Sequence, residues 1–246
     1  MTPSPLSHFV FPKTIPLPLK KVRSQTYLHE QLKWLYSEGG LYPTEVRINN
    51  SYADVQREQL IVEIQTRGFF SLKAKLSSLL RNYPVLVVTT IPIVKTIRKF
   101  DSTGVNQLSL RKSPKKSSLY EIFNELVHLI PFAQHPRFYL EVLLTAEEEQ
   151  RRENGQSSWN HTPRQRIQDR ILNEIVSREF FYCSRDYLRF LPADLPETFS
   201  TKALSCHLSI SRDLAQKIAY FLRRLSMLKQ VGRHKEGICY QRTGAQ

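Results

Sequence analysis

Alternation of apolar and polar residues predicts a β-hairpin in the first third of the chain. In the segment 60–65, apolar residues occupy every second position, which is the period of a strand. The wholly apolar face of that strand must pack inward, so Glu63 and Gln65 project together from the other face. A preceding strand contains Asp54, and the polar stretch 56–59 between the two strands is typical of a turn. The hairpin therefore brings Asp54 alongside Glu63.

Periodicity also predicts the elements around this hairpin. Apolar residues at helical spacing predict helices over 27–36 and 71–80. A continuous apolar and β-branched run at 85–91 predicts a strand buried on both faces, and it follows a crossover helix. We therefore expect that strand to lie parallel to the Glu63 strand in a right-handed βαβ unit. The remaining elements expected in this domain are a strand at 45–48, a helix near 119–130 and a strand near 138–144.

The C-terminal third has a different pattern. Apolar spacing predicts a helical stretch over 165–181, and Ser200 is a plausible N-cap for a short helix that ends near residue 208. After the turn 209–211, apolar positions 214, 218, 221, 225 and 228 predict a longer helix. The segments 229–233 and 237–241 then predict a hairpin. Helix, turn, helix and hairpin in this order describe a winged helix-turn-helix.

These elements predict an α/β protein whose small mixed sheet has flanking helices, followed by an α-rich winged helix domain. The expected layout is an extended N-terminal arm at 1–20, the α/β domain at 21–145, a charged linker or exposed insertion at 146–163, and the helical and winged helix domain at 164–246.

Composition then narrows the class of partner. The 246-residue chain carries a formal charge of +14, which favours a polyanion such as nucleic acid, although charge that only maintains solubility is an alternative. No apolar run is long enough to span a membrane. Three widely spaced cysteines favour a reducing cytoplasm. The sequence has no phosphate-cradling glycine loop or dinucleotide fingerprint, which argues against a nucleotide-driven motor or a Rossmann dehydrogenase.

The acidic residues of the hairpin suggest a metal site. Asp54 and Glu63, with the main-chain carbonyl of Ile64, would form a minimal oxygen cage for Mg²⁺ or Mn²⁺. Such an ion can neutralise phosphate charge and activate water in phosphodiester hydrolysis. Gln65, two residues past the glutamate, would contact the attacking water or the phosphate.

These residues resemble the PD-(D/E)XK nuclease superfamily, in which a metal-binding Asp is followed by Glu-x-Lys on the next strand. The resemblance covers at most residues 21–145, and it implies a restriction-endonuclease-like core and Mg²⁺-dependent cleavage of DNA. Gln65 departs from the pattern, because an amide lacks the positive charge of lysine. Lys73 or Lys75 on the following helix could replace that charge, and Glu30 resembles the family's optional helical acid. The whole chain also resembles uncharacterised bacterial proteins of this layout.

Two further sets of residues are candidates for DNA contact. In a helix-turn-helix the second helix presents its N-terminal residues to the major groove, and the hairpin tip contacts DNA beside it. The segment 111–116 contains Pro114, so we expect a basic loop suited to phosphates. The expected DNA-binding residues are Ser211, Arg212, Gln216, Lys217, Arg233 and Lys235, with Lys112, Lys115 and Lys116 from the loop.

The sequence leaves more than one function open. The first is a Mg²⁺-dependent deoxyribonuclease that acts on DNA in the cytoplasm, without a membrane. The second is a non-catalytic DNA-binding transcriptional regulator that keeps a nuclease-like scaffold; Gln65 favours it and the Asp54/Glu63 pair disfavours it. In a third, the winged domain serves protein assembly. A homodimer is also left open.

Overall fold

The computed structural model describes residues 26–153, 165–234 and 237–243, so the expected arm at 1–20 and the hairpin-tip residue Lys235 lie outside the described residues. The chain forms two compact units, each built from three segments. Unit 1 comprises residues 1–66, 88–118 and 142–179, and unit 2 comprises 67–87, 119–141 and 180–246. The units are therefore interleaved along the chain, whereas the sequence predicted consecutive domains divided at 146–163.

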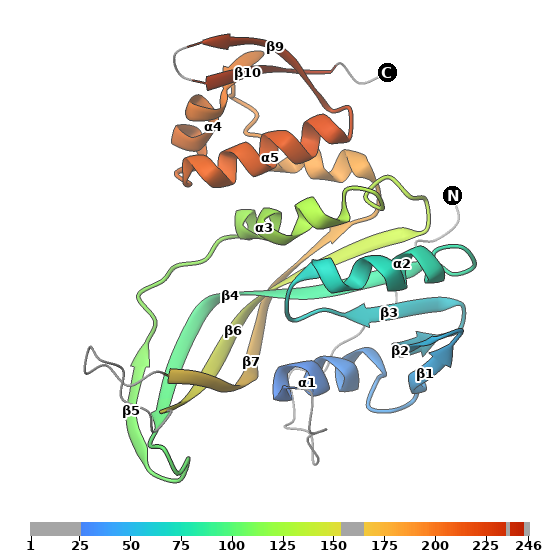
Figure 1. Cartoon of the computed structure of the whole chain (residues 1–246), viewed down its shortest axis with the longest axis vertical. Helices are drawn as coiled ribbons and strands as arrows, with labels where there is room; N and C mark the ends of the chain where they lie inside the picture. The colour runs from blue at the N-terminus through green and yellow to red at the C-terminus, as the bar shows by residue number, and fades with distance from the viewer. Residues whose placement is uncertain (1–25, 154–164, 235–236, 244–246) are drawn as a thin grey trace. The chain divides into compact units, whose positions relative to one another are not determined.

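The structure is α/β, as predicted, with one seven-stranded sheet and one three-stranded sheet (Figure 1). The helices are α1 (Tyr27–Tyr36), α2 (Lys73–Leu79), α3 (Phe123–Leu126), α4 (Thr201–Leu208) and α5 (Arg212–Arg224), with 3₁₀ helices η1 (Phe69–Leu72), η2 (Leu119–Ile122), η3 (Val127–Leu129) and η4 (Ser184–Phe190). The strands are β1 (Thr44–Ile48), β2 (Ser51–Arg57), β3 (Leu60–Ile64), β4 (Val85–Phe100), β5 (Gln107–Lys112), β6 (Phe138–Glu153), β7 (Gln165–Phe181), β8 (Thr198–Ser200), β9 (Leu228–His234) and β10 (Gly237–Arg242).

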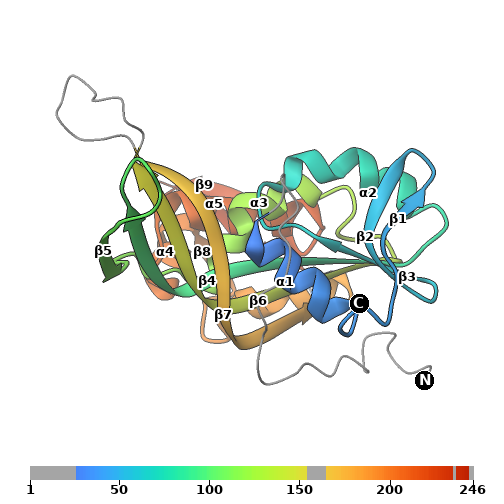
Figure 2. The same ribbon diagram turned by 90° about the horizontal axis from the view of Figure 1, so that it is seen from below.

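The large sheet is mixed and has the order β1-β2-β3-β4-β6-β7, with β5 pairing on β4. The β1/β2, β2/β3 and β4/β5 pairs are antiparallel. Lys95 of β4 contacts Glu149 of β6, and Lys99 contacts Glu153 with the same sequence offset, so these two strands run in parallel. Figure 2 shows β4, β6 and β7 as long, curved neighbouring strands.

Helix α1 packs its apolar stripe into unit 1 and is tied to β7 by hydrogen bonds. Leu28, Leu32 and Leu35 are almost completely buried. At the start of the helix the Tyr27 N–H donates to the Asp169 carboxylate over 2.8 Å. One turn later the buried Gln31 side chain both donates to the main-chain carbonyl of Leu172 and accepts from its N–H, at 3.0 and 2.8 Å. These contacts fix the position of the helix against the sheet.

Replacement of Gln31 by alanine tests this anchor. Gln31→Ala would leave the buried main-chain N–H and C=O of Leu172 without their partner, so we expect unfolding to become easier by about 2–4 kcal/mol. Urea titration followed by circular dichroism measures the change. The matched control is Gln168→Ala, at an exposed position of β7, the strand that contains Leu172. Its free energy of unfolding should lie within about 0.5 kcal/mol of wild type. Equal stabilities of the two variants would contradict the anchor.

Two predicted elements are wrong. Residues 165–181 form strand β7 rather than a helix, and residues 146–153 continue strand β6 rather than forming a linker. Apolar positions such as 167, 171 and 175 recur every four residues, which places them on one face of a helix and equally on one face of a strand. The charges of β6 are compatible with a sheet because they have partners on adjacent strands, as described below.

The C-terminal elements follow the predicted order after residue 198. Ser200 caps α4 by accepting from the Ala203 N–H, and Ser211 caps α5 by accepting from the Leu214 N–H. The two strands after α5 pair with each other and with the short strand before α4, in the order β8-β10-β9. The predicted hairpin and both helices are confirmed.

Helix α5 buries its apolar stripe in an aromatic core. Phe221 is fully buried and meets Phe123 and Tyr187 edge-on, with ring centroids 5.4 and 5.0 Å apart. Helix α3, which supplies Phe123, lies beside α5 in Figure 1. The module formed by residues 198–243 therefore packs one side of α5 against preceding elements of unit 2.

Two further expectations concern the environment of the protein. No helix among the described residues is long and apolar enough to cross a membrane. Cys239 is buried, but Cys183 and Cys206 are exposed. The cytoplasmic location stays a prediction.

Candidate functional site

The structure places Asp54 and Glu63 on adjacent antiparallel strands, as predicted. Strands β2 and β3 pair Val55 with Val62 and Gln56 with Ile61. Extending this register by one residue sets Asp54 opposite Glu63, and residues that are opposite in an antiparallel pair project from the same face, roughly 5 Å apart at their Cβ atoms. The Asp54 carboxylate also accepts the Ile64 N–H over 2.7 Å, which binds the two strands together at this point.

The face that carries these acids is covered rather than solvated. Every residue of β3 is buried, and Glu63 is only 2% exposed. Helix α1 contacts both β2 and β3, and Nε2 of His29 lies 3.3 Å from Oδ1 of Asp54. The polar face of α1 therefore lies over the carboxylate of Asp54, and the sequence pattern alone gave no sign of this cover.

A buried lysine connects α1 with the β1 edge of the same unit. The Lys33 ammonium contacts Glu30, one turn earlier, at 3.0 Å and also contacts Glu45 at the start of β1. Burial alone would lower the pKa of Lys33, but hydrogen bonds and charge interactions with Glu45 and Glu30 outweigh it and raise the pKa above its usual 10.5. Lys33 is therefore a permanent cation in unit 1, and Glu30 is committed to this contact.

Gln65 lies directly after β3 and is half-buried. Its N–H donates to the Val88 carbonyl over 2.8 Å, and its carbonyl accepts from the Thr89 hydroxyl over 2.8 Å. The main chain of Gln65 thus joins β3 to β4. Lys73 and Lys75 belong to α2 in unit 2, where the Lys73 ammonium lies 4.8 Å from the centre of the Phe70 ring. The charge-replacing role of these two lysines stays a prediction.

Asp54, Glu63 and the Ile64 carbonyl provide only the minimum number of oxygen ligands for a hard cation such as Mg²⁺. In the described part of the chain, no group of three or more His, Cys, Asp or Glu side chains is placed to hold a metal ion. Two carboxylates and the Ile64 carbonyl are nevertheless oxygen ligands of the kind that Mg²⁺ prefers. One oxygen of Asp54 accepts from Ile64 and the other faces His29, so an ion bound at Asp54 would share the carboxylate with these contacts.

A second polar cluster lies next to this region of the sheet. Arg170 of β7 donates twice to one oxygen of Glu147, at 2.9 and 2.7 Å, and reaches the carbonyl of Thr66 at 2.9 Å and the hydroxyl of Thr90 at 3.1 Å. The other Glu147 oxygen accepts from the Thr145 hydroxyl. One guanidinium therefore links β7, β6, β4 and the residue two positions after β3.

Acids of β6 pair with three of the seven Lys and Arg residues in the segment 95–116. Lys95, Arg98 and Lys99 of β4 contact Glu149, Glu148 and Glu153 of β6, respectively. Burial alone would raise the pKa of Glu149, but Lys95 and Arg151 outweigh it and lower that pKa. The remainder is exposed: Lys112 ends β5, so it is not in a loop as predicted, and Lys115 and Lys116 follow in the connecting segment.

The structure separates the residues that were expected to act together on α5. Ser211 is committed to capping the helix. Lys217 donates to Asp213 at 2.7 Å and to Asn124 at 2.9 Å, so this side of α5 faces the α3 segment. Arg212 and Gln216 lie on another side, which faces the β9–β10 hairpin.

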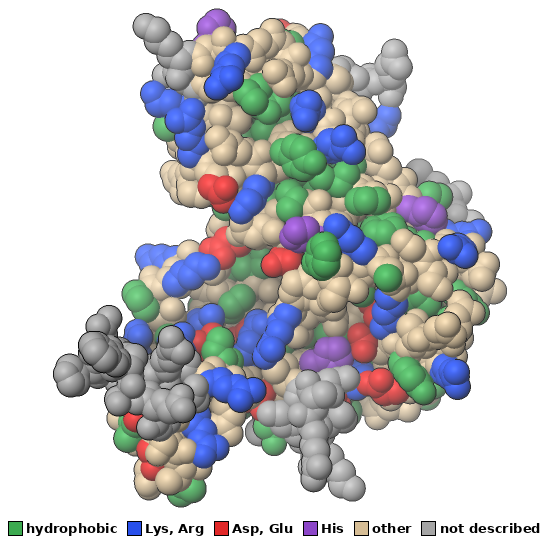
Figure 3. All heavy atoms as spheres, viewed as in Figure 1, with side chains coloured by type: hydrophobic (Ala, Val, Ile, Leu, Met, Phe, Trp, Pro, Cys, Tyr) green, Lys and Arg blue, Asp and Glu red, His purple; other side chains and the backbone are tan. Residues whose placement is uncertain are grey.

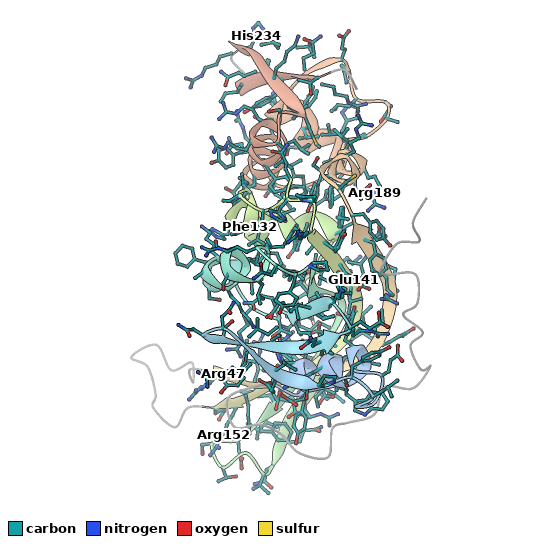
Figure 4. The ribbon with its side chains drawn as sticks, turned by 90° about the vertical axis from the view of Figure 1, so that its right-hand side faces the viewer. Arg47, Phe132, Glu141, Arg152, Arg189 and His234 are labelled. Atoms are coloured by element: carbon teal, nitrogen blue, oxygen red, sulfur yellow. The ribbon has the colours of Figure 1, made fainter. Side chains whose placement is uncertain are left out.

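A groove of about 410 Å³ runs between α5 and the β9–β10 hairpin. The described lining residues include no acid; they are Thr201, Arg212, Gln216, Tyr220, Arg223, Gln230, Arg233, Gly237, Ile238 and Tyr240. Burial raises the pKa of Tyr240, and the charge of Arg223 opposes that rise in part. Figure 3 shows basic side chains over this module, and Figure 4 places His234 at the end of the hairpin.

Sequence reasoning found Arg212, Gln216 and Arg233 but missed Tyr220 and Gln230 as groove residues. Positions 212, 216, 220 and 223 share one helical face, so their spacing contained the signal. Gln230 is brought to the groove by the hairpin, which only the fold could show. His29 was missed likewise, because its partner Asp54 lies on another element.

Comparison with known proteins places the chain in a family. Residues 26–182, more than half of the chain, match the model of a domain of unknown function, DUF8091. The chain belongs to the DUF8091 family. It is also 33% identical over 178 residues to an uncharacterised protein of Treponema pallidum (strain Nichols), covering 71% of this chain and 69% of that protein. No solved structure matches.

The DUF8091 match runs from the start of α1 to just past the end of β7. It therefore extends beyond residue 145, where the nuclease resemblance was expected to end, and it stops before the module at 198–243. Neither match assigns a nuclease family to the chain.

Proposed function

We propose that this DUF8091 protein binds duplex DNA and that its module at 198–243 is a winged helix-turn-helix. The observation that carries the proposal is the groove between α5 and the β9–β10 hairpin, which is lined by three arginines and no described acid. Duplex DNA is a dense polyanion, and arginine binds phosphates and base edges through a planar, permanently charged fork. The formal charge of +14 on the whole chain supports the same class of partner.

The packing of α5 indicates which side of the helix DNA would approach. Lys217 donates to Asn124 and to Asp213, while Phe221 is buried between aromatic rings on the inner side. The stripe that faces the hairpin is exposed, and Tyr220 is 43% accessible. DNA would therefore meet α5 and the hairpin together, as in winged helix proteins.

Loss of two groove arginines should weaken binding. For Arg223→Ala combined with Arg233→Ala, we expect the affinity for a fluorescein-labelled duplex of about 25 base pairs to fall about tenfold to a hundredfold at about 0.1 M salt. The slope of log K against log salt should decrease in magnitude by about 2, because two phosphate contacts are lost. Fluorescence anisotropy measures both quantities.

The matched control removes the same charge from the same module. Arg224 and Lys229 are exposed but do not line the groove, so Arg224→Ala combined with Lys229→Ala should weaken binding far less. Equal losses in the two double variants would reject the groove as the binding surface. Absence of binding by wild type at low salt would reject DNA as the partner.

We infer a second candidate function, Mg²⁺-dependent hydrolysis of DNA in a PD-(D/E)XK-like core. It is favoured by the register that sets Asp54 opposite Glu63 beneath α1. Asp54, Glu63 and the Ile64 carbonyl would hold the ion, and the ion would supply charge neutralisation and an acidified water. Gln65 would orient that water by hydrogen bonding.

The non-catalytic regulator remains the rival of this second function. Gln65 in place of lysine favours it, as does the involvement of both Asp54 oxygens with Ile64 and His29. A regulator would bind DNA without Mg²⁺-dependent cleavage, whereas a nuclease would cleave it.

A further inference from the structure

We propose that the α5–hairpin groove reads sequence, with Arg212 recognising guanine and Gln216 recognising adenine about two base pairs away. This inference rests on the proposed DNA binding and adds the class of target to it. Arginine forms a bidentate pair with O6 and N7 of guanine, and glutamine forms one with N6 and N7 of adenine.

The exposed stripe of α5 sets the length of the target. Residues 212, 216, 220 and 223 follow one face that lines the groove. At 1.5 Å per residue this stripe is roughly 16 Å long, which corresponds to about five base pairs at 3.4 Å each. Arg212 and Gln216 are separated by one helical turn, roughly 6 Å, or about two base-pair steps. Both belong to the N-terminal half of the helix, which is the half that reaches base edges in helix-turn-helix proteins.

The hairpin backbone passes close to Arg212. Gly237 has a φ of +123°, and a Cβ built there would lie 2.9 Å from Oγ1 of Thr201 and 3.2 Å from Nη2 of Arg212. The positive φ and the space beside Thr201 and the guanidinium both favour glycine at the start of β10. A guanidinium that is confined on one side by the hairpin loses less entropy on binding than a fully mobile one, which favours discrimination between bases.

The groove has one further arginine at each end, because Arg233 pairs with Ile238 beside Gly237 and Arg212, whereas Arg223 lies near Tyr240. Arg223 comes from the last turn of α5, and Arg233 comes from β9 near the hairpin tip. Arginines at the rim of a base-reading surface neutralise phosphates, which adds affinity without sequence preference. Arg223 and Arg233 would therefore bind phosphates on either side of the bases that Arg212 and Gln216 read.

The test is selection of duplexes from a library with a randomised ten-base-pair core. We expect wild type to enrich a motif that contains guanine and, about two positions away, adenine. Arg212→Ala should lose preference at the guanine position only, and Gln216→Ala at the adenine position only. For each, discrimination measured by anisotropy should fall about tenfold to a hundredfold. Arg223→Ala should keep the motif and weaken all duplexes alike, and Arg224→Ala, outside the groove, should change neither property.

Failure of this inference is distinguishable from failure of the proposed function. Salt-sensitive binding of the library by wild type without an enriched motif overturns sequence reading and leaves DNA binding intact. An enriched motif that is unchanged in Arg212→Ala and Gln216→Ala overturns the assignment of these two side chains. Absence of library binding at about 50 mM salt overturns both proposals.

Discussion

Arg170→Ala is expected to lower the free energy of unfolding by about 3–5 kcal/mol. The Glu147 side chain is 1% exposed, and Arg170 supplies two of its hydrogen bonds at 2.9 and 2.7 Å. Without the guanidinium, a buried carboxylate would keep only the Thr145 hydroxyl as a described partner, and the Thr66 carbonyl would lose a donor. Removing one member of a buried ion pair is costly because the other charge stays buried.

Denaturation in guanidinium chloride measures this loss, and three other variants define its cause. Arg166→Ala, at an exposed position of β7, should be close to wild type. Arg170→Lys should recover part of the stability, because an ammonium keeps the charge but cannot reproduce the fork. Arg170→Met combined with Glu147→Leu should be much more stable than Arg170→Ala, since no buried charge remains. If Arg170→Ala were as stable as Arg166→Ala, the proposed role of the cluster would be wrong.

Glu63→Gln and Asp54→Asn are each expected to reduce Mg²⁺-dependent cleavage of DNA by at least about a hundredfold. Metal-assisted charge stabilisation is worth several kcal/mol, and each 1.36 kcal/mol corresponds to a factor of ten in rate. An amide has the shape of the carboxyl group but lacks the negative charge that would hold the ion. The Asp54 amide oxygen can still accept the Ile64 N–H, so the effect on folding should be smaller than for alanine.

Cleavage of supercoiled plasmid with Mg²⁺ or Mn²⁺, quantified on gels, measures the activity. Glu58→Gln is the matched control, because Glu58 lies exposed in the turn of the same hairpin and should leave the rate unchanged. Cleavage that survives both Asp54→Asn and Glu63→Gln would remove these residues from the site. Salt-sensitive DNA binding by wild type without cleavage would instead identify the non-catalytic regulator.

Local patterns predicted most of the helices and strands. The hairpin of β2 and β3, the apolar strand β4 and the two capped helices α4 and α5 lie where the sequence indicated. Each depends on interactions within a few residues, such as alternation along a strand or a serine that accepts an N–H three positions later. Strand β7 was mistaken for a helix because its apolar residues recur every four positions, a spacing that both structures place on one face.

The candidate sites likewise combine local features, which the sequence predicts, with contacts between separate elements, which it does not. Opposite positions for Asp54 and Glu63 follow from the hairpin, which is a local structure. The contact of His29 with Asp54 brings together residues from separate elements, and the Gln31–Leu172 contact joins residues from distant parts of the chain. No periodicity in the sequence reports such contacts.

The sequence by itself determined the element order near the ends of the chain, the pairing of the two acids in the hairpin and the excess of positive charge. Only the tertiary structure decided which charged side chains lie next to one another. It neutralised Lys95, Arg98 and Lys99 with acids from β6, turned Lys217 toward Asn124, and gathered Arg212, Arg223 and Arg233 along one groove. The physical reason is that electrostatic partnership depends on distance in space, and the partners of these side chains are set by how strands and helices pack.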